Sequence, residues 1–411
     1  MTGTTPPRTE DRGTYRRVLS EPVFRLLFAT KTLTIAAASL RMFALSTLVY
    51  ATTRSPLWAA IAFASGFLPQ LAGSMLFGAA ADRIRPRPLI VAGYAIECAA
   101  AAVLAVVPMP AWVAIAGVAA VAVAAPVFNG AASRLVAEVL PGDLYVVGRS
   151  LFTAASSAAQ IGGLLAGGIA VAVLGSPQHA LLVVAAIHGL AALLAGLRLP
   201  DLAAPAPAEV RERSLLRSTW SGHRALLADP LVRRLLILQW LPAACATAAE
   251  GLLVPYAADR GFPAGSAGLL LGCLPLGMGI GDLVVSRALP APVRERLVAP
   301  LIGVIGVTLL GLWFGPALPL TVTLLLWTGA GLAYAVGLQR RFLAALPPGR
   351  QGQAFGLLGA GMTTSLGITP VLFGAAALTV GTAAAMALAG AASLLCLALV
   401  PRRGAERGTS G

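Results

Sequence analysis

Five charged residues stand inside long apolar stretches of this chain, where a charge is energetically costly: Lys31, Arg41, Glu97, Glu250 and Asp282. If those stretches cross a membrane, each charge needs a partner or a watery cavity, because burial at the bilayer centre costs a few kcal/mol. Glu250 has no basic residue nearby in the sequence. A carboxyl group kept from water is easily held protonated, which suits proton uptake and release. The alternative is a structural Glu250 bonded to a neighbouring helix.

Arg41 and Glu97 fall at similar depth in two apolar stretches that run in the same direction. This placement predicts an intramembrane ion pair within the first half of the chain. A substrate or proton site, with Glu97 as a second coupling candidate, is the other interpretation. Lys31, near the start of its stretch, can extend its amine to the membrane surface. Asp282 lies one turn from the end of its stretch, which favours a role in a gate.

These residues must be positioned by membrane-spanning helices. A mean hydropathy of +0.84, with 58% hydrophobic and only 11% charged residues, excludes an ordinary soluble domain. A helix needs about 20 residues to cross the hydrocarbon layer. The sequence predicts twelve spans, at 30–50, 57–79, 88–107, 111–132, 150–174, 180–197, 235–257, 265–286, 297–315, 319–338, 354–378 and 382–400.

The basic residues predict the orientation of these spans. Of the 30 Lys and Arg residues, 26 lie in the two tails or in every second gap between spans. Cytoplasmic loops retain Lys and Arg, so both ends should be cytoplasmic. The excess of Arg over Lys, together with abundant Ala, Gly and Leu, is typical of a GC-rich bacterial genome. We therefore expect a multi-pass protein of the bacterial inner (plasma) membrane.

The expected organisation is a tail (1–23), a six-helix bundle (24–197), a linker (198–234), a second six-helix bundle (235–400) and a tail (401–411). Within the linker, apolar residues share one helical face, which predicts an amphipathic helix on the cytoplasmic membrane surface. That face comprises Leu215, Leu216, Trp220, Leu226, Leu227 and Leu231.

The two bundles resemble an internal repeat. Arg134-x6-Pro-Gly recurs as Arg341-x6-Pro-Gly, an offset of 207 residues in a chain of 411, and Gly167 meets Gly374 at the same offset. Two six-helix halves around a midplane site form a plan used by secondary transporters, in which one half rocks against the other. The predicted fold class is therefore all-α and polytopic, with two pseudo-symmetric six-helix bundles.

The loop between spans two and three carries the most specific motif. It reads Gly78-Ala-Ala-Ala-Asp82-Arg83-Ile-Arg85-Pro-Arg87, and it resembles the G-x-x-x-D-R-x-x-R/K motif of the major facilitator superfamily. In that resemblance Gly78 allows close helix approach, and Asp82 joins Arg134 and the N-terminus of span eleven in an inner gate. Arg83 and Arg87 belong to the same motif, and Arg341 and Asp282 belong to its second, degenerate copy. The alternative is a loop that only sets topology.

Other segments resemble the enterobactin-exporter and macrolide-efflux branch of the superfamily. They are Phe24–Phe28, Leu48–Pro56 and Gly222–Leu231. Span five resembles an antiporter motif but has Leu164 where that motif has Pro, and span four lacks the Arg of proton-coupled drug antiporters. Proton antiport therefore does not follow from the resemblance alone.

Together these features predict a secondary transporter that exports an amphipathic small molecule (drug, natural product or siderophore) by rocker-switch alternating access, driven by protons. An importer or uniporter of the same fold is the alternative, and a receptor or structural membrane protein is the alternative of another class. Partners would be the substrate, protons and the lipid bilayer, with the chain as a monomer. Polar and aromatic candidates for the substrate cavity are Tyr50, Gln239, Trp327 and Tyr334.

The remaining site types are not indicated. The four Cys and three His residues show no paired or ligand spacing, so we expect neither a metal nor a cofactor. No nucleophile–base set suggests an enzyme, and no G-x-x-x-x-G-K-[ST] suggests a nucleotide-driven pump. The net charge of +14 is spread over short loops without interleaved aromatics, which argues against nucleic-acid binding.

Overall fold

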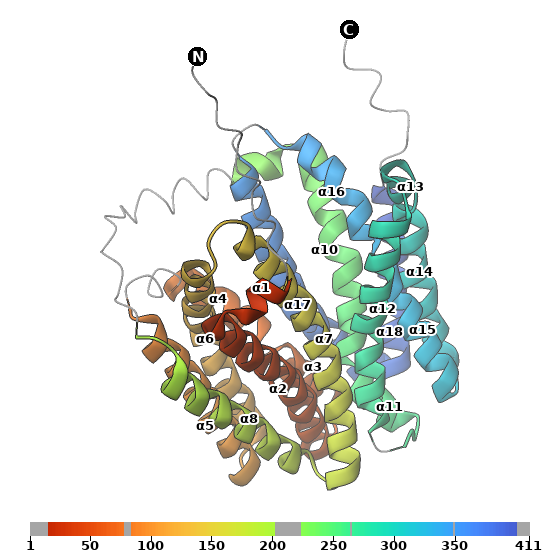
Figure 1. Cartoon of the computed structure of the whole chain (residues 1–411). Coiled ribbons are helices and arrows are strands. Elements are labelled where there is room, and N and C mark those ends of the chain that lie inside the picture. Colours follow the sequence, from red (N-terminus) through yellow and green to blue (C-terminus); the bar gives the residue numbers. More distant parts are fainter. Residues whose placement is uncertain (1–14, 78–83, 202–222, 264, 348–349, 401–411) are drawn as a thin grey trace, which may run out of the picture.

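The protein is an all-helical bundle in the computed structural model, which describes residues 15–77, 84–201, 223–263, 265–347 and 350–400. Within these ranges eleven helices are long and apolar enough to cross a membrane, and a shorter apolar helix runs over Val298–Phe314. The helices lie side by side in two groups, with the first half of the chain on one side and the second half on the other (Figure 1).

The first half begins with a short helix, α1, which leads into the long α2. The bounds are α1 Tyr15–Ser20, α2 Pro22–Thr53, α3 Pro56–Ala64, α4 Phe67–Phe77, α5 Pro86–Val106, α6 Ala111–Val139, α7 Asp143–Leu174 and α8 Pro177–Arg198. Helices α3 and α4 together form the second span, interrupted at Ser65 and Gly66.

The second half repeats this order with more interruptions. The bounds are α10 Pro230–Gly251, α11 Leu253–Asp259, α12 Ser266–Ala288, α13 Ala291–Arg296, α14 Val298–Gly311, η2 Leu312–Phe314, α15 Leu318–Gly331, α16 Tyr334–Ala345, α17 Gln351–Val380, α18 Thr382–Leu395 and η3 Cys396–Leu399. Helix α13 lies at one end of the bundle and α11 at the opposite end (Figure 1). We call these the α13 end and the α11 end.

Proline and polar caps determine where several helices begin. Pro230 starts α10, and the Asp229 carboxylate accepts hydrogen bonds from the backbone N–H groups of Leu231 (2.8 Å) and Val232 (3.0 Å). Proline is well suited to this position, because the first N–H groups of a helix have no partner within it. The new helix start corrects the expected linker helix: Leu231 belongs to α10, so one continuous amphipathic face across Asp229 was wrong. Linker residues 202–222 lie outside the described residues.

The two halves exchange equivalent helix contacts. Helix α7 of the first half packs against α12 of the second, and α17 of the second half packs against α3 of the first. At the first contact Gly168 meets Gly268 so closely that a Cβ built on Gly268 would lie 2.4 Å from the Gly168 Cα. At the second, a Cβ on Gly374 would lie 2.8 Å from the Ala60 side chain. These reciprocal contacts agree with the repeat seen in the sequence.

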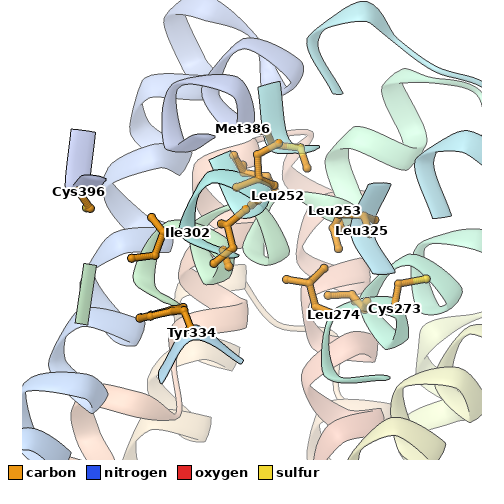
Figure 2. Packing of buried hydrophobic residues seen from close by; sticks show 14 of the residues in the cluster. Leu252, Leu253, Cys273, Leu274, Ile302, Leu325, Tyr334, Met386 and Cys396 are labelled. Atoms are coloured by element: carbon orange, nitrogen blue, oxygen red, sulfur yellow. The ribbon is translucent and has the colours of Figure 1, made fainter. Parts of the chain in front are cut away.

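The interiors of the halves differ. The largest apolar cluster fills the second half, and Figure 2 shows its members Leu252, Leu274, Ile302, Tyr334 and Met386 converging from different helices. The first half has smaller clusters near its two ends. The polar side chains between those clusters form the site described next.

Candidate functional site

A cavity of about 390 Å³ lies among the helices of the first half. Every lining residue except Glu250 comes from α2 to α8 and the junctions between them. Its ionisable lining residues are Lys31, Arg41, Tyr94, Glu97, His188 and Glu250. The structure thus brings Glu250 to the same cavity as the predicted Arg41–Glu97 pair. The sequence analysis expected a site between the two halves, whereas this cavity lies among the helices of the first half.

Arg41 of α2 and Glu97 of α5 form an ion pair at the edge of this cavity. Arg41 Nη2 lies 3.4 Å from Glu97 Oε2, and the two side chains are only 13% and 18% exposed. Opposite charges this far from water attract each other more strongly than they would at the surface. Arg41 Nε and Glu97 Oε2 are buried and have no hydrogen-bond partner among the described residues. The two side chains are thus held together by the ion pair, with no hydrogen bond at these two atoms.

Lys31 lies further toward the start of α2. Ten residues separate it from Arg41, a rise of roughly 15 Å along the helix. Its amine donates a hydrogen bond to the Asn129 side-chain oxygen of α6 and also lines the cavity. The expected extension of Lys31 to the membrane surface is therefore replaced by an inward contact with another helix.

His188 is a cavity residue that the sequence analysis missed. It lies on α8, is 2% exposed, and its Nδ1–H donates to the Val184 carbonyl oxygen (2.9 Å). It lines the cavity together with Lys31, Arg41 and Glu97. His188 lies 91 residues after Glu97 in the sequence, so only the packing of α8 on α5 reveals this cluster.

Glu250 is the single cavity residue from the second half. It is the penultimate residue of α10, which ends at Gly251 before the chain resumes as α11 at Leu253. A Cβ on Gly251 would lie 2.9 Å from Pro370 of α17 and 3.4 Å from Phe63 of α3, so this helix end touches both halves. Among the described residues no ion pair or hydrogen bond involves the Glu250 carboxyl group.

The four expected substrate-cavity residues lie elsewhere. Trp327 is 58% exposed on the outside of the bundle, and Tyr334 is buried in the second-half core (Figure 2). The Tyr334 hydroxyl donates to the Gln239 carbonyl oxygen at 2.8 Å, and Gln239 is itself buried. Tyr50 lies near the α11 end, where its hydroxyl donates to Asp259 Oδ1. None of the four lines the cavity.

The motif loop is described only in part. Gly78, Asp82 and Arg83 lie outside the described residues. Arg87 donates to the Gly196 carbonyl oxygen and so joins α5 to α8 within the first half. Arg134 donates through Nε to Glu138 Oε1, 2.7 Å away and one turn later on α6.

In the second half the loop after α12 supplies an acidic partner that the sequence analysis did not select. Arg341 of α16 lies 3.2 Å from Glu295 of α13, and Arg340 lies 4.0 Å from the same carboxylate. No ion pair of Asp282 occurs among the described residues. In the sequence Glu295 stands between Arg294 and Arg296, and a single acid in a basic loop was not selected as a site residue.

Solved structures share this architecture. The nucleoside transporter NupG has a TM-score of 0.74 and 12% identity, covering 92% of this chain and 98% of that chain. A POT family transporter in complex with 5-aminolevulinic acid has a TM-score of 0.70 and 11% identity, covering 92% and 95%. The peptide transporter POT in complex with sulfate has a TM-score of 0.69 and 12% identity, covering 92% and 93%. At such low identity these similarities concern the fold alone.

The sequence itself supplies the family. No curated protein matches the chain. Residues 27–348 match the profile of the Major Facilitator Superfamily. That match spans most of both halves, and with the eleven membrane-capable helices it indicates a multi-pass transporter rather than an enzyme. The chain belongs to the major facilitator superfamily.

Proposed function

We propose that the protein is a secondary active transporter that exports an amphipathic small molecule in exchange for protons, by rocker-switch alternating access. The observation that carries this proposal is the first-half cavity, which Glu250 lines together with the Arg41–Glu97 pair while having no ion pair of its own among the described residues. A carboxyl group in that position can take up and release a proton without breaking an existing ion pair. Apolar residues such as Met42, Phe63 and Phe67 line the same cavity and suit the apolar part of a substrate.

Export is the proposed direction because the segments Phe24–Phe28, Leu48–Pro56 and Gly222–Leu231 resemble the enterobactin-exporter and macrolide-efflux branch. The charge bias of the loops supports a bacterial inner-membrane protein with both ends in the cytoplasm. We propose a monomer of two functional bundles, 24–197 and 235–400, with Val298–Phe314 as the twelfth span beside the eleven longer ones.

Import of a small solute is the second candidate. The solved structures with this fold include transporters described as peptide and nucleoside transporters. The cavity also contains two cations, Lys31 and Arg41, which would accommodate a polar or zwitterionic solute.

The inner gate is proposed at the α13 end. There Asp82 would join Arg134 in the first half, as the resemblance implies. Supporting this, the second half holds Arg341 by Glu295 at 3.2 Å, and Arg341 is the residue that repeats Arg134. An acid from the loop after an even-numbered span would thus bind the equivalent arginine in both halves.

Flux into inverted membrane vesicles tests direction and coupling together. Vesicles containing the chain would be loaded with an acidic interior and offered ethidium or a labelled macrolide. Proton-driven accumulation above that of vesicles without the chain supports export. Uptake only into right-side-out vesicles supports import, and flux in neither preparation would favour a receptor or structural protein. Collapse of the pH difference with a protonophore is the control for coupling.

A further inference from the structure

A carboxylate at the α11 end of the molecule joins the two halves. Asp259 is the last residue of α11, in the second half. Its Oδ1 accepts a hydrogen bond from the Tyr50 hydroxyl of α2, 3.2 Å away, in the first half. Its Oδ2 accepts a hydrogen bond from the Thr382 hydroxyl at the start of α18, 2.6 Å away.

The carboxylate depends on these two hydroxyls. Among the described residues Asp259 has no ion pair, although Arg260 follows it directly. The Arg260 guanidinium instead donates to the Gly315 carbonyl oxygen and lies 5.9 Å from the Phe262 ring centroid. Hydrogen bonds to an ionised group are about twice as strong as neutral ones, so the Tyr50 and Thr382 contacts matter for this charge.

The two bonds do different work. Thr382 and Asp259 both belong to the second half, so their bond fixes α11 against α18 within one bundle. Tyr50 belongs to the other bundle, and it also packs against the largest apolar cluster, to which both halves contribute. The Tyr50–Asp259 bond is therefore a polar contact that must break if the halves separate at this end.

The bond lies at the end where the halves are already tightly packed. Gly168 meets Gly265 and Gly268 there, and Gly374 meets Leu57 and Ala60 near the start of α3. In this structure the α11 end is thus the closed side, and the Tyr50–Asp259 hydrogen bond adds a polar contact to the close helix packing there.

We propose that Asp259 is a gating residue that holds the α11 end of the transport pathway closed by binding Tyr50, and that releases Tyr50 when the cavity opens on this side. The inference rests on the proposed alternating-access function, and it adds a gate at the opposite end from the Asp82 motif. It assigns Tyr50 to the gate rather than to the substrate.

Distances between spin labels in lipid nanodiscs test the gate directly. Labels would be placed on cysteines at Thr52 and Thr379 for the α11 end, and at Ser133 and Leu343 for the α13 end, all exposed positions on opposite halves. The four native cysteines would first be replaced by alanine, and this background compared with the native chain for monodispersity.

Tyr50→Phe removes the one hydroxyl and keeps the packed ring. We expect the distance between the labels at the α11 end (the outer pair) to lengthen and the distance at the α13 end (the inner pair) to shorten. The ratio of molecules open to molecules closed at the α11 end should change about tenfold, as for loss of a hydrogen bond to a charged group. Asp259→Asn should have the same effect as Tyr50→Phe, with a longer outer distance and a shorter inner distance. Tyr256→Phe is the matched control, because that hydroxyl bonds the Leu312 carbonyl oxygen within the second half.

Unchanged distances in both Tyr50→Phe and Asp259→Asn would overturn the gate. An equal shift in Tyr256→Phe would also overturn the gate, and so would a longer outer distance without a shorter inner one. Either result would indicate that the helices at the α11 end have only loosened locally. Because these distances require neither substrate nor protons, they separate the two proposals. If the label distances shift as expected but the chain transports no substrate, the gate is supported and export is refuted. If proton-driven flux occurs but the distances do not shift in the variants, only the gate is refuted.

Discussion

Arg41 Nη2 lies 3.4 Å from Glu97 Oε2 across α2 and α5, and Glu250 lines the same cavity without such a partner. This contrast divides the three residues by role. Glu97 joins two helices through its ion pair, which suits a structural role. Glu250 has no ion pair among the described residues, and for this reason we propose it, rather than Glu97, as the coupling residue.

The Arg41–Glu97 pair should be needed for stability as a pair. Arg41→Ala leaves a buried carboxylate without its cation, and we expect a loss of about 3–5 kcal/mol in the free energy of unfolding, with lower abundance in the membrane. The double variant Arg41→Met/Glu97→Leu should recover most of that loss, because no lone charge remains. Thermal unfolding in detergent measures both. A double variant as unstable as Arg41→Ala would show that the charges do more than neutralise each other.

Glu250→Gln should uncouple transport from protons. The neutral amide resembles the protonated acid, so substrate binding and exchange down a concentration gradient should persist. Accumulation driven by a pH difference should fall to the level of vesicles without a gradient, because no proton can be released at this position. Flux in inverted vesicles, with and without an acid interior, measures both activities. Full proton-driven accumulation in Glu250→Gln would falsify the coupling role and leave Glu97 as the next candidate.

Asp82→Asn should reduce transport about tenfold or more while membrane insertion and abundance stay near normal. The expected cause is loss of a charge-assisted bond to Arg134, worth about 1.5–3 kcal/mol in the gate. Asp282→Asn should have a smaller effect, because no described residue forms an ion pair with it. Transport at the unmutated rate in Asp82→Asn would leave the loop with a role in topology alone.

Glu295→Gln should reduce transport several-fold, more than Asp282→Asn does. Glu295 holds Arg341 at 3.2 Å and so ties α13 to α16, and its side chain is only 18% exposed. The matched control is Asp201→Asn, which breaks the exposed 3.2 Å ion pair with Arg85 and touches none of the proposed gate residues. Comparable flux in Glu295→Gln and Asp201→Asn, at equal protein abundance, would argue against a gate built from the second copy of the motif.

The orientation can be tested with single cysteines in a background without native ones. Probes at Ser176 and Thr379 should react with an impermeant thiol reagent added to intact cells, and probes at Ser133 and Ser214 should react only after lysis. Thr379 is preferable to its neighbour Thr382, which is 5% exposed and bonded to Asp259. Labelling of Ser214 in intact cells would reverse the proposed topology.

The sequence predicted the helices better than their faces. Charge clusters and prolines mark helix ends by local chemistry, so the starts of α3, α8 and α17 lie within about three residues of expectation. The facing direction of Trp327 or Tyr334 could not be predicted in the same way. Lipid and protein core are both apolar, so a membrane helix has little amphipathic pattern to show which side packs inward.

The polar cluster shows the same limit from another direction. Matching depth along two spans was enough to predict Arg41 opposite Glu97, because both helices start from the same membrane surface. His188 and Asn129 join that cluster only through the packing of α8 and α6 around α2 and α5. Glu295 was missed for a different reason. Its partner Arg341 is 46 residues away, beyond the two predicted spans 297–315 and 319–338, and the sequence does not show that the chain returns to the same place.

The contact between Gly168 and Gly268 limits how this protein can evolve. The two helices touch there through backbone alone, and a Cβ on either glycine would come within 2.5 Å of backbone atoms of the opposite half. Neither position can accept a larger residue unless the other half moves away, and a change at one cannot be compensated by trimming the other. Substitutions are therefore tolerated more readily on the outer surface, where a residue such as Trp327 is 58% exposed, while this contact between the halves stays restricted to the smallest residue.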